Sequence, residues 1–243
     1  MKKIYISILF FVSCSFLFCE KIYISSDGYF IYRFSDDFSK METSTIEDPN
    51  TSSSQIIQYE ENSIQFWQVG NIKYVKFEFD FYFTLVNEEK SYVLIEREKY
   101  NEYWNRTREK TGIYKASSEG KIGRQKYDAH NLLYLSFAPW LSDTAEIGEW
   151  ITFEGFHEVN SICIINGFVD VNSPEKFEKY GKVKKMNVYD EEGNCIDSFD
   201  VENTYEVQRF ELSKTLSFVK IEIVDIYEGT EFSNLAITMM QFH

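Results

Sequence analysis

Carboxylates and histidines are the side chains in this sequence with the most obvious capacity for catalysis. The chain has 39 acidic residues and three histidines, His130, His157 and His243. Two carboxylates about 5 to 10 Å apart can hydrolyse a glycosidic bond, but among so many acidic residues some pair can always be imagined. No histidine accompanies a Gly-x-Ser-x-Gly motif or a cysteine in motif context, and no P-loop or Gly-x-Gly-x-x-Gly occurs. The sequence therefore predicts neither an enzyme nor a cofactor.

Cysteines offer a second kind of chemistry. Two of the four lie near the N-terminus, and the others are Cys163 and Cys195. A disulfide between Cys163 and Cys195 requires an oxidising compartment and neighbouring strands with suitable Cα spacing; two separate buried thiols are the favoured alternative. Two cysteines with no histidine at ligand spacing cannot form a zinc site, so no metal site is predicted.

The N-terminal segment, residues 1–19, has the pattern of a secretory signal peptide. It contains two lysines, an apolar run from Ile4 to Val12 and no acidic residue. That run is shorter than the ~20 residues of a membrane-spanning helix. Cleavage before Cys14, in the sequence FVSC, would leave a lipidated cysteine, and simple secretion is the equal alternative. We therefore expect an extracytoplasmic protein: periplasmic, in the cell envelope or secreted.

The charge of the chain limits its partners. The formal net charge is −14 at pH 7, with no cluster of lysine and arginine. Nucleic acids and anionic lipids are bound through basic patches. We expect neither of them as a partner. Aromatic residues make up 18% of the chain and prolines number three, which also argues against a disordered acidic tail.

Residues 20–110 read as a small β-rich domain of unknown family. Hairpins are predicted at residues 22–34, around Asp27-Gly28, and at residues 55–69. The polar stretch Ser35–Ser54 between them is expected to be a loop. From Val75 to Leu85, six apolar residues alternate with mostly polar ones, which predicts one long strand with a bulge near Tyr74-Val75.

A further strand is expected at Tyr92–Ile95, and the charged run Glu96–Lys110 follows it. This run carries Tyr100, Tyr103 and Trp104. A linker helix or strand whose aromatic side chains pack on the domains is favoured over an aromatic surface that faces a sugar or a partner.

Residues 111–243 contain many short strands separated by turns. The stretch Gly148–Phe168 reads as two core strands joined by a short turn. More strands are expected at 183–189, 195–201, 206–212 and 218–226, and one turn of helix at 174–180. Such spacing is typical of an all-β sandwich or barrel.

Four segments of this half resemble a known family. They are YDAHNLL (127–133), GEWITF (148–153), INGF with GKVKKMNVYDEEG (165–168 and 181–193), and VKIEIVDIYEGTEFSNLAI (219–237). Together they resemble the discoidin-like module of bacterial NAD glycohydrolases, the NADase-type glycan-binding or translocation domain. The resemblance covers about 130 residues and implies a galactose-binding-like, discoidin-type jelly-roll sandwich, here preceded by the small β-rich domain.

The sequence departs from the family pattern where related modules carry acidic residues. Tyr134 follows the Asn-Leu pair, Asn234 stands where Asp is common, and the closing strand has Thr238-Met239 in place of Ser-Glu. Because calcium needs six to eight oxygen ligands, several of them carboxylates, we expect no structural calcium there.

The implied fold places a ligand site in the loops at one end of the sandwich, where aromatic rings would stack on a sugar. Loop position nominates six candidates: Tyr134, Phe137, Trp140, Tyr180, Tyr227 and Phe232. For Trp140, a core position under the loops is the favoured alternative. The predicted function is non-catalytic binding of a glycan. The alternatives are an envelope scaffold or adhesin that binds a protein partner and, least favoured, an enzyme that hydrolyses glycans or NAD.

Overall fold

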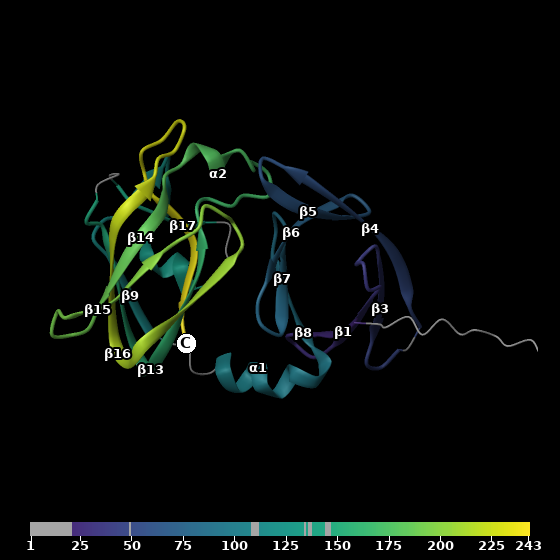
Figure 1. The fold of residues 1–243 in the computed structure, drawn as a ribbon. Helices are drawn as coiled ribbons and strands as arrows, with labels where there is room; N and C mark the ends of the chain where they lie inside the picture. The colour runs from purple at the N-terminus through teal and green to yellow at the C-terminus, as the bar shows by residue number, and fades with distance from the viewer. Residues whose placement is uncertain (1–20, 49, 108–111, 134, 136–137, 144–146) are drawn as a thin grey trace, which may run out of the picture.

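The structure, a computed structural model, describes residues 21–48, 50–107, 112–133, 135, 138–143 and 147–243. The predicted signal peptide and Cys14 lie outside these residues. Two β-units lie side by side, a barrel formed by the first part of the chain and a sandwich formed by the second (Figure 1). The predicted all-β class is confirmed.

The barrel is closed and entirely antiparallel. Each strand pairs with the next along the chain, and the last pairs with the first. Its strands are β1 (Lys21–Ser25), β2 (Phe30–Phe34), β3 (Lys40–Thr45), β4 (Ser52–Glu61), β5 (Ile64–Val69), β6 (Ile72–Glu78), β7 (Tyr82–Val86) and β8 (Ser91–Glu96).

The two predicted hairpins are confirmed as β1–β2 and β4–β5, but the predicted loop Ser35–Ser54 is wrong. It contains all of β3 and the start of β4, and β3 pairs with both β2 and β4. Barrel closure explains the difference, because a polar segment gains ladder hydrogen bonds on both sides that its composition alone does not predict.

The long strand predicted over residues 75–85 is also wrong, because the chain reverses within it. Strands β6 and β7 form a hairpin, closed by a bond from the Phe79 N–H to the Tyr82 carbonyl at 2.8 Å. Because of this reversal, the alternating apolar residues of the segment lie on two different faces of the barrel wall. Val75 and Phe77 lie outside the barrel against the sandwich, whereas Phe83 and Leu85 lie in the barrel core.

The expected bulge near Tyr74-Val75 is absent, since β5 and β6 pair in continuous register through it. Apolar residues occupy consecutive positions at Tyr74 and Val75 for a different reason. Tyr74 packs on the barrel core and Val75 packs outside, so both faces of β6 contact apolar surroundings.

The barrel is linked to the sandwich by a short helical segment. It consists of a 3₁₀ turn, η1 (Arg97–Lys99), and helix α1 (Tyr100–Thr107). Of the linker helix or strand that the sequence predicts, the structure has the helix. Its aromatic residues contact the barrel: the Tyr100 hydroxyl donates to the Ser26 carbonyl at 3.1 Å, and Tyr103 packs edge-on against Tyr82.

Within its described residues, the second unit has nine strands and two short helical segments. They are β9 (Gly112–Ala116), β10 (Gly120–Ile122), β11 (Gln125–Tyr127), η2 (Ala129–Leu133), β12 (Trp140–Leu141), β13 (Trp150–Asn166), α2 (Lys176–Lys179), β14 (Lys182–Tyr189), β15 (Cys195–Asp200), β16 (Val207–Tyr227) and β17 (Ala236–Phe242). The turn of helix expected near Pro174 is confirmed as α2.

Two long strands run through both layers of the sandwich. In one layer β13 from Trp150 to Glu154 pairs with β9 and with the second half of β16, which also pairs with β14. In the other layer β13 from Ser161 onward pairs with the start of β16 and with β17.

Two predictions about the sandwich strands are therefore wrong. Gly148–Phe168 was expected to form two strands joined by a turn, and 206–212 with 218–226 to form two more, but β13 and β16 are each continuous. Their register is irregular between Glu154 and Ser161, where the strands pass from one layer to the other. Bulges let a strand bend without ending.

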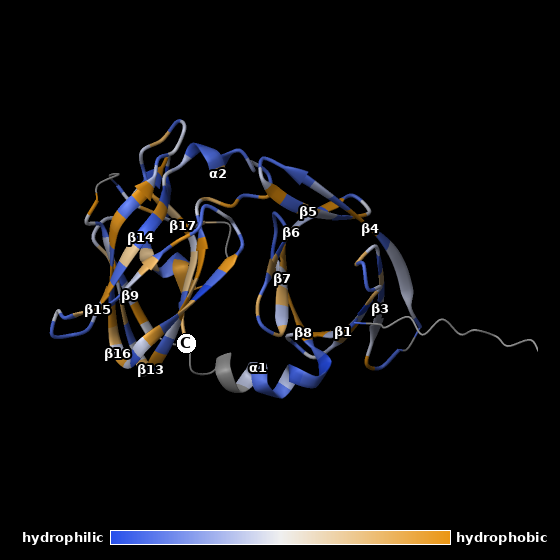
Figure 2. Cartoon of the chain, in the orientation of Figure 1, coloured by the Kyte–Doolittle hydropathy of each residue, from blue (hydrophilic) through white to orange (hydrophobic). Residues whose placement is uncertain are grey.

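The sandwich core lies between the layers and includes Ile151, Phe153, Ile162, Ile164 and Met240 among its fully or almost fully buried residues. Figure 2 shows apolar and polar residues alternating along these strands. In the second half of β13 both faces are buried. Cys163 and Ile165 point away from the sandwich core and pack against the barrel.

The surface where barrel and sandwich meet, which we call the seam, is a hydrophobic cluster. Barrel residues Phe66, Val75 and Phe77 pack with sandwich residues that include Ile165 and Met239. A hydrogen bond crosses the seam from the Gln65 N–H to the Tyr205 hydroxyl at 3.1 Å. Buried apolar contacts of this kind hold the two units together.

Candidate functional site

Several loops of the sandwich converge at one end, which we call the loop end. Strand pairing brings them together, because the end of β13 lies beside the start of β17, and the end of β16 lies beside the start of β14. The segments between these strands, 167–181 and 228–235, must therefore meet. The sequence predicts a ligand site in end loops of this kind.

The structure brings two of the six candidates together at the loop end. The rings of Tyr180 and Phe232 stack with their centroids 4.6 Å apart and an interplanar angle of 29°. Tyr180 is buried and also contacts Phe168, whereas Phe232 is 37% exposed. Burial raises the pKa of the Tyr180 hydroxyl above its ordinary value, so this hydroxyl is neutral near pH 7. The pair presents one partly exposed ring on a buried support.

Backbone hydrogen bonds fix the loop that carries Phe232. The N–H groups of Glu231 and Phe232 both donate to the Lys179 carbonyl, at 3.2 and 2.8 Å. Gly229 permits this approach, since a Cβ there would lie 2.3 Å from the same carbonyl oxygen. An ion pair between Lys179 and Glu231, at 3.1 Å, adds charged groups beside the stacked rings.

The other described candidates do not join this stacked pair. Tyr227 is half-buried, and its hydroxyl donates to the Val201 carbonyl at 3.1 Å. Trp140 is fully buried and its indole N–H donates to the Ser118 carbonyl at 3.0 Å. A stacking role for Trp140 is therefore corrected to a core role, because no face of its ring reaches solvent. Tyr134 and Phe137 lie outside the described residues.

The disulfide that the sequence left open, between Cys163 and Cys195, is not formed. Of the two buried thiols that the sequence favours, Cys163 is buried on β13, but Cys195 is exposed at the start of β15, so the prediction is wrong for Cys195. Cys163 lies opposite Arg209 of β16 and Cys195 opposite Tyr189 of β14, so their strands are not neighbours at these positions.

Hydrogen bonds give a physical role to two residues that depart from the family pattern. The Asn234 amide nitrogen donates to the carbonyls of Ser142 and Asp143 at 2.9 and 3.1 Å. The Thr238 hydroxyl donates to the Gly167 carbonyl at 2.7 Å and accepts from the Val169 N–H. The Asn234 amide and the Thr238 hydroxyl thus donate hydrogen bonds to carbonyl oxygens. An ionised carboxylate at either position has no proton to donate and would need a cation between the oxygens. The expectation of no calcium stays a prediction.

Neither a metal site nor a membrane-spanning helix is found among the described residues. They contain no group of three or more His, Cys, Asp or Glu residues placed to hold a metal ion. Within the same residues, no helix has both the length and the apolar character needed to cross a membrane.

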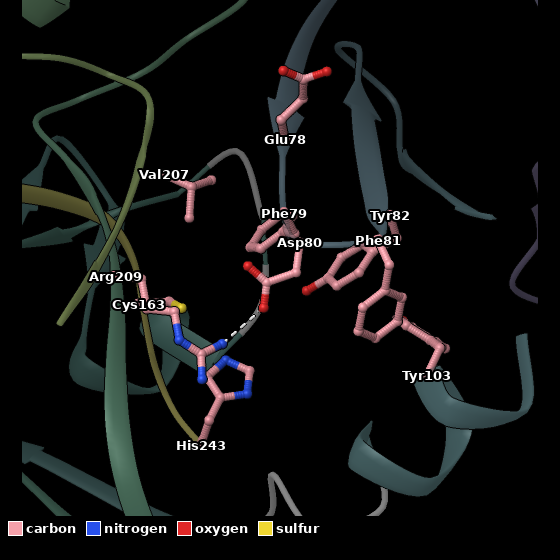
Figure 3. Close-up of a pocket in the computed structure, with 10 residues that line it drawn as sticks. All are labelled: Glu78, Phe79, Asp80, Phe81, Tyr82, Tyr103, Cys163, Val207, Arg209 and His243. Carbon is pink, nitrogen blue, oxygen red and sulfur yellow. Dashed lines mark hydrogen bonds and ion pairs between the residues drawn. The ribbon is translucent and has the colours of Figure 1, made fainter. Parts of the chain in front are cut away.

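A pocket of about 190 Å³ lies at the seam, and sequence reasoning missed it (Figure 3). The β6–β7 hairpin supplies one wall, including Phe79, Asp80 and Tyr82, and β16 supplies Arg209 opposite. The Arg209 Nη1 binds the Asp80 carboxylate across the pocket at 3.0 Å. Phe79 and Tyr82 stack almost parallel, with an interplanar angle of 7° and centroids 4.4 Å apart. The pocket therefore combines aromatic rings with an ion pair.

Comparison with known proteins identifies the class of the second unit. Its two layers, shared by bent strands and closed by loops at one end, form a sandwich of the F5/8 type C kind. The family model described as the NAD glycohydrolase translocation F5/8 type C domain matches residues 104–243. The match spans more than half of the chain, and the chain belongs to this family.

Solved structures with a similar fold include carbohydrate-binding modules of family 32. One from Clostridium perfringens, in complex with GalNAc-β-1,3-galactose, is 13% identical, with a TM-score of 0.43 over 54% of this chain and 94% of that one. Another, from Streptococcus pneumoniae EndoD, is 13% identical, with a TM-score of 0.41 over 55% and 99% of the two chains. No curated protein matches the chain.

Proposed function

We propose that this chain is a non-catalytic binding protein that recognises a glycan at the loop end of its sandwich. The observation that carries the proposal is the stacked pair of Tyr180 and Phe232, in which one ring is partly exposed and the other is buried beneath it. An aromatic face held in this way can pack against the apolar face of a sugar ring.

Groups that can bind sugar hydroxyls lie close to this ring. Lys179 and Glu231 form an ion pair in the two segments that carry Tyr180 and Phe232, with 36% and 52% of their side-chain surfaces exposed. A hydroxyl both donates and accepts hydrogen bonds, so it can bind an ammonium and a carboxylate together. We place the protein outside the cytoplasm, on the basis of the signal-like residues 1–19, with either a lipid anchor on Cys14 or free secretion.

One observation favours the second candidate function, an envelope scaffold that binds a protein. Phe156 is 77% exposed on β13, and Ile113, on the adjoining strand β9, is 52% exposed. Exposed apolar side chains that lie together are a feature of protein-binding surfaces.

The first prediction tests the loop-end site. The chain from residue 20 onward is applied to a glycan array, and Phe232→Ala is compared with Phe156→Ala, which removes an equally large exposed ring away from the loop end. Since an aromatic contact contributes about 0.5–1.5 kcal/mol, Phe232→Ala is expected to weaken glycan binding by up to about tenfold, whereas Phe156→Ala leaves it unchanged.

Other outcomes would contradict the proposal. An array without signal, together with capture of a protein partner that Phe156→Ala abolishes, would favour the scaffold. Turnover of glycans or NAD by the purified chain would show an enzyme.

A further inference from the structure

A second pocket lies next to the pocket in Figure 3 along the seam. The second pocket has a volume of about 220 Å³, and Glu78 and Val207 line both. We call the pair of pockets the seam groove. For comparison, a cavity of about 150 Å³ can hold a benzene molecule, so each pocket has room for one six-membered ring. Together they exceed about 300 Å³, the lower limit for small-molecule sites.

The walls of the seam groove are fixed by contacts between barrel and sandwich. Beneath the groove lie the apolar residues of the seam, such as Phe77, which is 2% exposed. The Gln65–Tyr205 hydrogen bond and the Asp80–Arg209 ion pair join the two walls. A site between walls held in this way is formed before a ligand arrives, which lowers the entropic cost of binding.

Each pocket pairs aromatic rings with polar groups. In the first, Phe79 and Tyr82 lie beside the Asp80–Arg209 ion pair. Burial raises the pKa of Tyr82 far above its ordinary value, so its phenol is uncharged. The hydrogen bonds that the described residues make with Arg209, to Asp80 and Glu211, use two of its five N–H donors.

In the second pocket, Lys76 lies over the Trp67 and Phe38 rings, at 4.7 and 4.4 Å from their centroids, and contacts Glu78. The polar lining also includes the amides of Gln58 and Gln65, the Tyr205 hydroxyl and the Glu206 carboxylate. Both pockets thus combine aromatic rings with carboxylates and a basic side chain, and the second pocket adds two amides.

The charge of the groove selects the type of ligand. Its cations are matched by carboxylates, Lys76 by Glu78 and Arg209 by Asp80 and Glu211. An anionic ligand would have to displace these carboxylates in a chain of net charge −14. A neutral hydroxyl can instead bind the donor and the acceptor of an intact ion pair at once.

The barrel wall of the groove also argues against a peptide. Strands β6 and β7 are paired on both sides within the closed barrel, so this wall has no open edge for strand addition. Near the start of β16, the Gln208 side chain exchanges hydrogen bonds with the backbone of Glu202 at 2.8 and 3.1 Å. Side chains rather than an open barrel edge therefore meet the ligand.

We propose that the seam groove binds a neutral oligosaccharide of at least two sugar rings, one ring in each pocket. This site is separate from the loop end and does not depend on glycan binding there. Its ligand would contact both units of the chain, whereas a ligand at the loop end contacts the sandwich alone.

The test uses neutral oligosaccharides of one to six rings, terminated by galactose, N-acetylgalactosamine, glucose or mannose, with binding measured by calorimetry on the chain from residue 20 onward. The proposal expects at least a tenfold gain in affinity from one ring to two or three for at least one series. Phe79→Ala and Glu78→Gln are each expected to reduce the affinity for the longer sugars at least fivefold. Glu78 is 70% exposed at its side chain, so Glu78→Gln should not disturb folding.

Phe232→Ala separates the two sites. In a variant lacking the Phe232 ring, the gain in affinity with chain length should remain if the longer sugars lie in the seam groove. If Phe232→Ala abolished all oligosaccharide binding while Phe79→Ala and Glu78→Gln left the affinity unchanged, the proposed groove site would be wrong. The loop-end site alone would then be supported. Absence of binding by every oligosaccharide, or capture of an acidic or basic peptide that Phe79→Ala abolishes, would overturn the groove site too.

Discussion

At the scale of single residues, Asn234 is the most informative departure from the family pattern. Its amide nitrogen donates to two carbonyls, those of Ser142 and Asp143. The Ser142 hydroxyl in turn accepts the N–H of Leu235 at 2.8 Å. Asn234 therefore connects two loops of the loop end by hydrogen bonds that need a donor at this position.

Asn234→Asp is expected to destabilise the protein at pH 7. A carboxylate cannot donate to the two carbonyls, and leaving such groups unsatisfied costs about 1–3 kcal/mol. The free energy of unfolding, measured in urea, should fall by this amount. The loss should shrink as the pH falls through the pKa of the new carboxyl group, because the protonated acid can donate again.

Asn71→Asp provides the matched control. Asn71 is exposed in the turn between β5 and β6, so this change adds the same charge without removing the two bonds. If Asn71→Asp were as destabilising as Asn234→Asp, net charge rather than the hydrogen bonds would be the cause.

At the scale of elements, β13 shows how a single strand serves two cores. Ile164 faces the sandwich core while its neighbour Ile165 faces the barrel, and both are fully buried. This explains the apolar run from Ile162 to Ile165, since a strand covered on both faces loses the alternation of a half-exposed one.

Ile165→Ala is expected to cost about 2–5 kcal/mol in the free energy of unfolding, the range for truncation of a buried isoleucine. The expectation depends on the barrel, because without it Ile165 would lie on an open face. Ile113→Ala, at a residue that is 52% exposed, should change the free energy by less than about 0.5 kcal/mol. Equal, small effects in urea denaturation would show that the barrel does not cover β13.

Some of the strands and hairpins could be predicted from the sequence and others could not. Hairpins with Gly at the turn, such as the one at Asp27-Gly28, and the sandwich strands with clear alternation were predicted. The reversal at Asp80-Phe81 was not, because no Gly, Pro or Asn marks it and the apolar alternation continues through it unchanged. Local patterns also cannot show that β13 and β16 pass through both layers, since bulges hide the continuity.

The candidate site, too, could be predicted from the sequence only in part. Loop position nominated Tyr180 and Phe232, which the structure brings into contact, and also Trp140, which is buried. Composition could not separate these, because a tryptophan beneath a loop and an aromatic residue on it have the same sequence context. The seam groove combines residues as far apart as Asp80 and Arg209, and no short-range pattern predicts such a pairing.

At the scale of the whole molecule, the seam makes two units act as one. We propose residues 20–110 and 111–243 as the two domains, with the boundary just after α1. The two domains contact each other through an apolar cluster and a hydrogen bond between Gln65 and Tyr205. Large apolar interfaces restrict the relative motion of domains.

Thermal unfolding is accordingly expected to give one transition. Near-ultraviolet circular dichroism, which reports the aromatic side chains of both units, and calorimetry should give the same midpoint. Tyr205→Phe removes the bond to Gln65 and should lower the free energy of unfolding by about 0.5–1.5 kcal/mol while the transition stays single. Two resolved transitions in the unmodified chain would show that the seam does not couple the units.

Closure of the barrel has a consequence for how copies of the chain can meet. Open strand edges are templates on which other chains add strands, and proteins protect them with charge or remove them. All eight barrel strands have two partners, so among the described strands the open edges belong to the second unit. One of these, β15, carries Asp197 and Asp200, whose charges disfavour the approach of an identical strand. Amyloid-like stacking of the first unit would therefore have to begin with rupture of an existing ladder.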